Sequence, residues 1–163
     1  MGVDRVISVL NLLNMKVKKI NIKDKKNILK WRNHESILKT SFSKKITIAE
    51  HHKWFNNLLN NKNYLGLIYD NGFKKLAVVI FKLVDNSAYI SIYLVPNEPL
   101  NYGIGDRVLT NSEKILTSNY RGVYKILAFV KKNNIKSKKF FMRNKFYYDN
   151  KKNIYTKNLN EKN

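Results

Sequence analysis

Apolar residues recur along the chain with two periods, one typical of strands and one typical of helices. Segments 64–69, 73–84 and 88–95 are rich in β-branched and aromatic residues. Turn sequences separate them, Asp70-Asn71-Gly72 and Asp85-Asn86-Ser87. This pattern predicts three consecutive antiparallel strands joined by tight turns.

Further strands and helices are expected on both sides of these three strands. Residues 15–22 alternate like a strand, and 124–130 is a short apolar run typical of a buried strand. Because helices are predicted before and after it, 124–130 is expected to lie parallel to and beside 88–95. Residues 36–45 are predicted to be a loop with a short turn. The helical pattern covers 3–13, 24–31, 48–59, 103–118 and 134–144.

The order of these elements predicts an α/β fold, with a mixed, mostly antiparallel twisted sheet flanked by helices. Residues 1–14 form a separate N-terminal helix in this prediction, and 15–149 form the single domain. A last strand is expected at 146–148. The Lys/Asn-rich segment 150–163 is expected to be a mobile tail.

The formal net charge of +21 suggests an anionic partner. The proportion of Lys and Arg among the basic residues argues against nucleic acid as that partner. Of the 32 basic residues, five are Arg and the remainder are Lys. Arg is the side chain that best recognises phosphate and guanine edges. A compositional bias towards Lys therefore explains the charge better than nucleic-acid binding does, and no nucleic-acid partner is expected.

Other function classes are excluded by what the chain lacks. It has no Cys, which rules out thiol nucleophiles and Cys-based zinc sites, and its three His have no metal-ligand spacing, so no metal is expected. No apolar run approaches the roughly 20 residues of a membrane span. No secretory signal pattern is visible. A cytoplasmic protein is expected.

The segment with the most chemical information runs from Tyr89 to Leu109, where a strand leads through a glycine-bearing loop into a helix. Gly103 and Gly105 allow a close backbone approach, and the first N–H groups of the helix point towards a ligand. A pyrophosphate is suited to such a position. An ordinary strand-to-helix turn is the alternative interpretation.

This segment resembles motif A of the GNAT acetyltransferases, and the downstream residues Asn134–Ser137, Phe141 and Phe146 resemble their next motif. The resemblance implies a GNAT fold with a splayed parallel strand pair, and acetyl-CoA as co-substrate. The residues that it implies for acetyl-CoA binding are Ile92, Tyr93, Leu94, Tyr102, Gly103, Ile104, Gly105, Asp106, Arg107 and Asn134.

The chain departs from the family pattern at two positions. Leu100 stands where the family usually has Gln or Arg, so pyrophosphate binding depends on backbone amides and nearby basic residues such as Arg107. Phe141 stands where many members have a Tyr that protonates the leaving thiolate. Another group or water then protonates the sulfur, or the thiolate leaves unassisted.

The resemblance implies direct transfer, in which a neutral amine attacks the thioester carbonyl. A backbone N–H from Ile92–Leu94 would stabilise the tetrahedral state. Candidate catalytic residues are Glu50, Ser91 and Tyr93. Glu50 is a possible general base, or only an acid favoured by the helix dipole. Ser91 and Tyr93 share a strand face with Tyr89 that meets either the acceptor or the core.

The first third of the chain indicates the acceptor. Trp31-Arg32-Asn33 and the segment 50–55 resemble a GNAT subgroup that acetylates amino sugars on nucleotide carriers, including pseudaminic-acid-pathway and spore-coat polysaccharide enzymes. The implied acceptor is a UDP-linked 4-amino-6-deoxy sugar used in bacterial surface glycan synthesis. The substrate-binding residues that follow are Arg32, His51, Trp54 and Tyr89.

Purely structural roles remain possible for these residues. The Trp residues and His51 lie on apolar helix faces, where core packing is common, and Arg32 has Glu35 within reach on its helix. Two other functions also remain, acetylation of a protein N-terminus or another small amine, and a non-enzymatic basic binding module. Residues 2–10 also resemble the closing helix of the nucleotide-sugar hydrolase domain that precedes the acetyltransferase in fused relatives.

Overall fold

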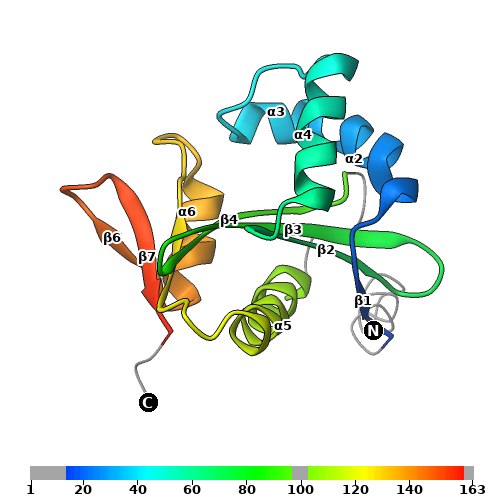
Figure 1. Ribbon diagram of the computed structural model, residues 1–163. Coiled ribbons are helices and arrows are strands. Elements are labelled where there is room, and N and C mark those ends of the chain that lie inside the picture. Colours follow the sequence, from blue (N-terminus) through cyan, green and yellow to red (C-terminus); the bar gives the residue numbers. More distant parts are fainter. Residues whose placement is uncertain (1–13, 97–102, 160–163) are drawn as a thin grey trace, which may run out of the picture.

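Seven strands form one twisted sheet in the order β1-β2-β3-β4-β5-β7-β6 (Figure 1). The computed structural model describes residues 14–96 and 103–159, so the predicted helix 3–13 and the loop 97–102 lie outside the described residues. The strands are β1 (Lys16–Lys19), β2 (Tyr64–Asp70), β3 (Lys75–Val84), β4 (Ser87–Leu94), β5 (Lys125–Ala128), β6 (Tyr147–Asp149) and β7 (Ile154–Asn158).

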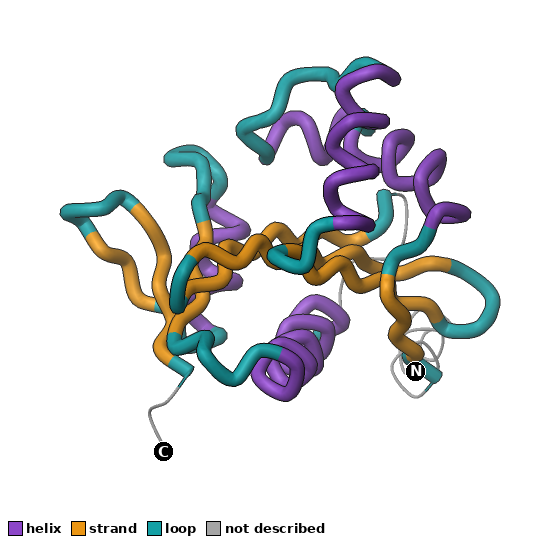
Figure 2. The backbone as a smooth tube through the Cα atoms, in the orientation of Figure 1, coloured by secondary structure: helices purple, strands orange, loops and turns teal. Residues whose placement is uncertain are grey.

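Helices cover both faces of this sheet (Figure 2). Three of them, α2, α3 and α4, lie on one side, and α5 lies on the other side (Figure 1). Phe141 of α6 belongs to the same buried cluster as the apolar residues of α5. The helical elements are η1 (Ile22–Asp24), α2 (Lys25–Arg32), α3 (Glu35–Thr40), α4 (Ile48–Asn60), α5 (Ile104–Asn119) and α6 (Ile135–Arg143).

The alternation of side chains along each strand divides the core into two layers. On β3, Val79 and Phe81 face the α5 layer, where they join Val108 of that helix in one cluster. Their neighbours Val78 and Ile80 face the opposite layer, with α2 and α4. A two-sided apolar strand is what a sheet with helices on both faces requires.

The strand arrangement confirms the predicted topology. β2, β3 and β4 form an antiparallel meander. β4 and β5 are parallel, with α5 in the connection between them. Their pairing covers only Ser87–Tyr89 against Lys125–Leu127, although β4 continues to Leu94. Beyond Tyr89 the two strands therefore diverge, which is the predicted splay.

The structure corrects the expectation of a mobile tail. Residues 154–158 form β7, which lies between β5 and β6 and pairs with both. Ile154, Tyr155 and Thr156 are buried, and Lys157 makes an ion pair with Glu113 of α5 at 2.7 Å. The predicted last strand at 146–148 is observed as β6, one residue later, at the edge of the sheet.

Two other segments differ from their predictions. The strand expected over 15–22 ends at Lys19, because Asn21 and Asp24 form a capping box that starts η1. The expected loop 36–45 includes the six-residue helix α3, with His34 as its N-cap. Within the described part of the chain, no helix is long and apolar enough to cross a membrane.

Candidate active site

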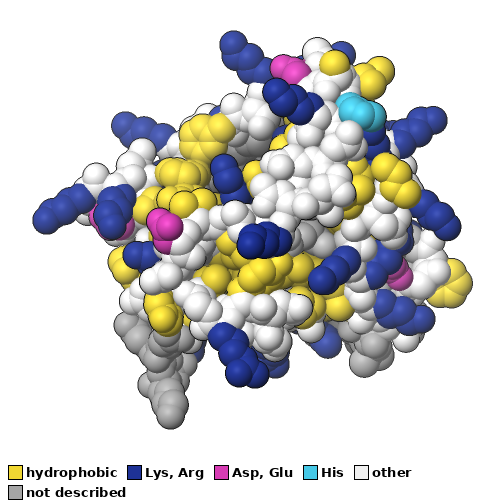
Figure 3. All heavy atoms as spheres, viewed as in Figure 1, with side chains coloured by type: hydrophobic (Ala, Val, Ile, Leu, Met, Phe, Trp, Pro, Cys, Tyr) yellow, Lys and Arg dark blue, Asp and Glu magenta, His cyan; other side chains and the backbone are white. Residues whose placement is uncertain are grey.

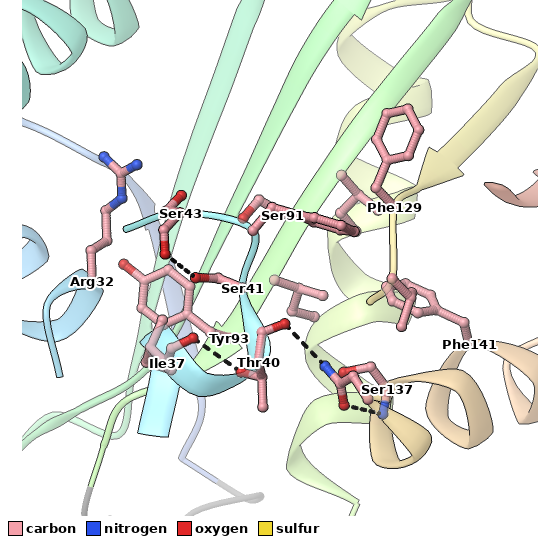
Figure 4. Close-up of a pocket in the computed structure, with 15 residues that line it drawn as sticks. Arg32, Ile37, Thr40, Ser41, Ser43, Ser91, Tyr93, Phe129, Ser137 and Phe141 are labelled. Atoms are coloured by element: carbon pink, nitrogen blue, oxygen red, sulfur yellow. Dashed lines mark hydrogen bonds between the residues drawn. The ribbon is translucent and has the colours of Figure 1, made fainter. Parts of the chain in front are cut away.

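A cavity of about 300 Å³ lies where β4 and β5 diverge (Figure 4). Its walls come from the second half of β4, the segment after β5, α6, the end of α2, and α3 with the residues that follow it. The lining residues are Arg32, Ile37, Thr40, Ser41, Phe42, Ser43, Ile90, Ser91, Ile92, Tyr93, Phe129, Val130, Asn134, Ser137 and Phe141.

The two ends of this cavity differ in chemistry. Figure 4 shows Arg32 and Tyr93 at one end, and Phe129 and Phe141 at the other, with Ser91 between them. Arg32 Nη1 and Tyr93 Oη are buried and have no hydrogen-bond partner among the described residues. A buried donor without a partner costs about 1–3 kcal/mol. The polar end of the cavity therefore holds two donors whose hydrogen bonds are not completed by the described residues.

Burial shifts the pKa values of Arg32 and Tyr93. Desolvation lowers the pKa of Arg32, and the neighbouring Tyr93 opposes that shift. Arginine nevertheless stays charged in proteins. Burial raises the pKa of Tyr93, and Arg32 partly offsets the effect. At neutral pH, Tyr93 is therefore a neutral hydroxyl beside a guanidinium cation.

His51 and Trp54 do not line the cavity. His51 is 1% exposed, and its Nε2 lies 2.8 Å from the carbonyl oxygen of Lys25. Since that oxygen only accepts, Nε2 carries the proton in this contact. Desolvation lowers the pKa of His51. The Trp54 ring lies beneath the guanidinium of Arg32, 4.1 Å from its carbon. Of the predicted substrate-binding residues, the structure brings only Arg32 to this cavity.

The structure also places the three candidate catalytic residues. Ser91 and Tyr93 line the cavity. Glu50 is exposed at the start of α4, where its Oε2 accepts hydrogen bonds from Thr47 N and Thr47 Oγ1, both 2.7 Å. These bonds lower the pKa of Glu50. Glu50 caps a helix and does not reach the cavity, and no described lining residue is Asp, Glu or His.

On the cofactor side, the start of α5 has the expected geometry. Gly103 is the N-cap with φ of 75°, a left-handed conformation that favours glycine. A Cβ on Gly105 would lie 3.2 Å from Phe140 Cε2 of α6. The absence of a side chain at Gly105 therefore lets α5 and α6 approach closely. Ile104 is buried in the core, and Arg107 is exposed.

Of the other residues predicted to bind the cofactor, some line the cavity and others make structural contacts. Asp106 accepts hydrogen bonds from Arg143 Nε at 3.0 Å and Asn144 Nδ2 at 2.6 Å, so its carboxylate ties α5 to the end of α6. Ile92 lines the cavity, whereas Leu94 packs against the core on the α5 side. Tyr102 lies outside the described residues.

Asn134 connects the two halves of the site. Its Oδ1 accepts from Ser137 N at 3.1 Å and caps α6, and its Nδ2 donates to Thr40 O at 3.3 Å (Figure 4). Phe141 is buried and packs edge-on against Phe140 and Phe146.

Several lining residues were not predicted from the sequence. Ser41 and Ser43 follow α3 in a segment predicted as loop, and Ser137 lies one turn before Phe141 on α6. Phe129 lies at the far end of the cavity (Figure 4). The Ser-rich sequence Thr40–Ser43 was the available signal for the first group, because hydroxyl side chains recur there without apolar periodicity.

No family model matches the chain. The acetyltransferase PseH of Campylobacter jejuni is 31% identical over 140 residues, which are 83% of this chain and 85% of PseH. The crystal structure of the C. jejuni N-acetyltransferase PseH superposes with a TM-score of 0.63 and 22% identity, over 91% of this chain and 99% of PseH.

Other acetyltransferases share the fold. The spermidine N-acetyltransferase of Vibrio cholerae, in complex with CoA and spermine, superposes with a TM-score of 0.72 and 15% identity, covering 84% of this chain and 83% of its own. The aminoglycoside acetyltransferase AAC(6')-Ib, in complex with coenzyme A, has a TM-score of 0.74 and 13% identity, covering 89% of this chain and 95% of its own.

The fold, with its splayed parallel pair, is that of solved acetyltransferase structures. The chain belongs to the GNAT N-acetyltransferase superfamily, and within it resembles the pseudaminic-acid-pathway group that includes PseH. It is an acetyl-CoA-dependent enzyme that transfers an acetyl group to an amine.

Proposed function

We propose that this enzyme acetylates the free amine of a nucleotide-linked amino sugar, of the 4-amino-6-deoxy type, in bacterial surface glycan synthesis. The similarity to PseH supports a sugar acceptor. The observation that carries the proposal is the pair of buried, unpartnered donors, Arg32 Nη1 and Tyr93 Oη, at the polar end of the cavity. Sugar hydroxyl and carbonyl oxygens are the acceptors that such donors need.

The residues around the splay are suited to acetyl-CoA. The β4 edge beyond Tyr89 has no β5 ladder partner, so its backbone is available to the pantetheine arm. The start of α5, with Gly103 as N-cap, offers amide N–H groups to a pyrophosphate. Asn134 lines the cavity. When bound, acetyl-CoA supplies a thioester as the activated acyl donor.

The charge pattern of the cavity favours a neutral amine. A nearby cation lowers the pKa of an ammonium group, whereas a carboxylate would raise it. Arg32 is such a cation, and no described lining residue carries a carboxylate. The amine thus loses its proton to solvent before transfer, without a protein base. Its nitrogen then forms the bond to the acetyl carbon as the carbon–sulfur bond breaks, and the surplus amine proton leaves to water.

Protonation of the departing thiolate does not need Phe141. That ring has no ionisable proton, but the hydroxyl of Ser137 lines the same cavity one helical turn earlier. A thiol with a pKa of about 8.5 also leaves readily as the anion. Transfer therefore depends mainly on holding the amine close to the thioester.

The proposal is tested by comparing acceptors at matched concentration: a UDP-linked 4-amino-6-deoxy sugar, spermidine, and a peptide with a free N-terminus. The sugar nucleotide should have the highest kcat/KM. Arg32→Ala should raise KM for the sugar nucleotide about tenfold or more, as expected for a lost hydrogen bond to a charged group. KM for acetyl-CoA should change little. Equal or faster acetylation of the peptide or of spermidine would overturn the proposed acceptor.

A further inference from the structure

A second cavity, of about 450 Å³, lies beside the first on the outer strands of the sheet. Tyr89 and Tyr93 point to the same face of β4, and Tyr93 packs against the α2 and α4 layer. The second cavity thus lies on the face that carries α2–α4, above the strands β5, β7 and β6. Its lining residues are Ser87, Tyr89, Lys125, Leu127, Phe129, Tyr147, Asp149, Lys152, Ile154, Thr156 and Asn158.

A single aromatic wall separates the two cavities. Phe129 lines both of them. The Tyr89 ring stacks on Phe129, with centroids 5.8 Å apart and an interplanar angle of 16°. Phe129 is 58% exposed although Tyr89 stacks on its ring. A ligand that fills the first cavity and extends past Phe129 enters the second.

The second cavity has the chemistry of a phosphate site next to a stacking surface. Lys125 and Lys152 line it, and among the described residues neither ammonium is within ion-pair distance of a carboxylate. The one carboxylate present, Asp149, already accepts hydrogen bonds from the backbone N–H of Lys151 and Lys152. The local balance is therefore positive. Tyr147 is 52% exposed and offers an open ring.

The basic side chains elsewhere do not form a comparable site. Figure 3 shows Lys and Arg scattered over the visible face, without one continuous stripe. What distinguishes Lys125 and Lys152 is their place in a cavity between aromatic rings. Aromatic rings bind bases by stacking, and ammonium groups bind phosphates.

The volumes of the two cavities also support a shared ligand. Pockets that enclose a drug-sized ligand have volumes of about 300–1,000 Å³. The first cavity, at about 300 Å³, must hold both the thioester and the reacting amine. An acceptor with a nucleotide carrier needs more space than that, and the adjoining 450 Å³ supplies it.

The geometry points to the second cavity as the site of the nucleoside diphosphate part of the acceptor, with the amino sugar in the first. Lys125 and Lys152 bind the diphosphate, and Tyr147 with the Tyr89–Phe129 stack faces the base. This assignment rests on the proposed function. It places the nucleotide away from His51 and Trp54, which do not line either cavity.

The test uses the full chain and three probes: the UDP-linked amino sugar, the same amino sugar as a methyl glycoside, and UDP alone. The double variant Lys125→Glu/Lys152→Glu should raise KM for the UDP-linked sugar on the order of tenfold or more. KM for acetyl-CoA and kcat/KM for the methyl glycoside should stay within about twofold. Lys114→Ala, on α5 across the sheet, is the matched control and should change none of these values.

UDP alone separates failure of this inference from failure of the proposed function. Calorimetry should show UDP binding to the wild type, lost in the double variant and in Tyr147→Ala, with circular dichroism showing that both variants fold. UDP binding that survives both variants, or a wild type that binds no UDP, overturns the second-cavity site even if sugars are acetylated. UDP binding lost in these variants, with no sugar acetylated, leaves the site standing and removes the proposed acceptor.

Discussion

The guanidinium carbon of Arg32, at the end of α2, lies 4.1 Å from the centre of the Trp54 ring on α4. The same indole lies 5.6 Å from the ring of the buried His51, centroid to centroid. These contacts order the residues from core to cavity: His51 supports Trp54, Trp54 supports Arg32, and only Arg32 meets the ligand space. Packing residues on α4 thus position a polar group on α2.

Removing the indole should weaken acceptor binding without touching the cavity wall. A cation–π contact is worth about 0.5–2 kcal/mol. Trp54→Leu should therefore raise KM for the acceptor by about two- to thirtyfold, with a small effect on KM for acetyl-CoA. Trp54→Phe keeps a ring and serves as the control, with a smaller rise. Equal losses for both substrates would show that Trp54 serves general stability instead.

His51 should make the free energy of unfolding depend on pH. Burial lowers the pKa of His51 in the folded state, below the value of about 6.5 in the unfolded chain. The unfolded chain therefore binds the proton first as the pH falls. The stability contributed by neutral His51 is complete above about pH 6.5 and is lost as the pH drops from there towards the folded-state pKa, by at most about 1.4 kcal/mol per pH unit.

Urea unfolding at pH 7.5 and pH 5.5 measures this dependence. His51→Gln retains a donor for the carbonyl of Lys25 but does not titrate, so its free energy of unfolding should fall less between the two pH values than that of the wild type. An identical pH dependence in the variant would contradict the assignment.

Gly105 should control the distance between α5 and α6. A valine there would force its Cβ against Phe140 Cε2, which lies 3.2 Å from the ideal position. Gly105→Val should displace the start of α5 and weaken acetyl-CoA binding at least tenfold by calorimetry. Gly105→Ala should have a milder effect, and Phe140→Leu in the valine background should restore part of the affinity. Unchanged affinity in Gly105→Val would separate this contact from cofactor binding.

The central meander was predictable because turn chemistry and strand patterning agree. Gly72 has φ of 89° in the first turn, a conformation that glycine adopts easily. The parallel placement of β5 beside β4 followed from the intervening helix, since a parallel neighbour requires a crossover. The backbone scaffold of the site could thus be derived from local pattern and connection rules.

The missed parts depend on partners distant in sequence. β7 contains only Ile154, Tyr155 and Thr156 as buried positions, between Lys and Asn residues. Its strand conformation comes from pairing on both sides, which no local pattern records. Ser41 and Ser43 follow Thr40, whose carbonyl oxygen accepts a hydrogen bond from Asn134, 94 positions later in the chain.

The orientation of the His51 ring could not be predicted from the sequence. Its place on the apolar face of α4 was visible in the sequence, and that face is buried. The resemblance implies a nucleotide contact for His51, and in the structure its Nε2 donates to the carbonyl oxygen of Lys25. The buried face of α4 directs the His51 side chain into the core, and His51 therefore does not line the cavity at the β4–β5 splay.

Restoring a hydroxyl at Phe141 should change turnover little. Phe141 lines the cavity, and its ring also packs edge-on against the rings of Phe140 and Phe146. Phe141→Tyr offers a proton donor to the departing thiolate. Because a thiolate of ordinary pKa leaves readily at neutral pH, attack by the amine should limit the rate. We therefore expect kcat to stay within about threefold of the wild type.

Phe146→Tyr is the matched control for this prediction. Phe146 is 4% exposed and does not line the cavity, so its hydroxyl would enter the core and lower Tm without affecting kcat. A gain in kcat of about tenfold or more in Phe141→Tyr corresponds to about 1.4 kcal/mol of barrier. Such a gain would show that protonation of the leaving sulfur limits turnover. The Ser137→Ala variant then decides whether the wild type relies on the hydroxyl of Ser137 for that proton, because its kcat should fall only in that case.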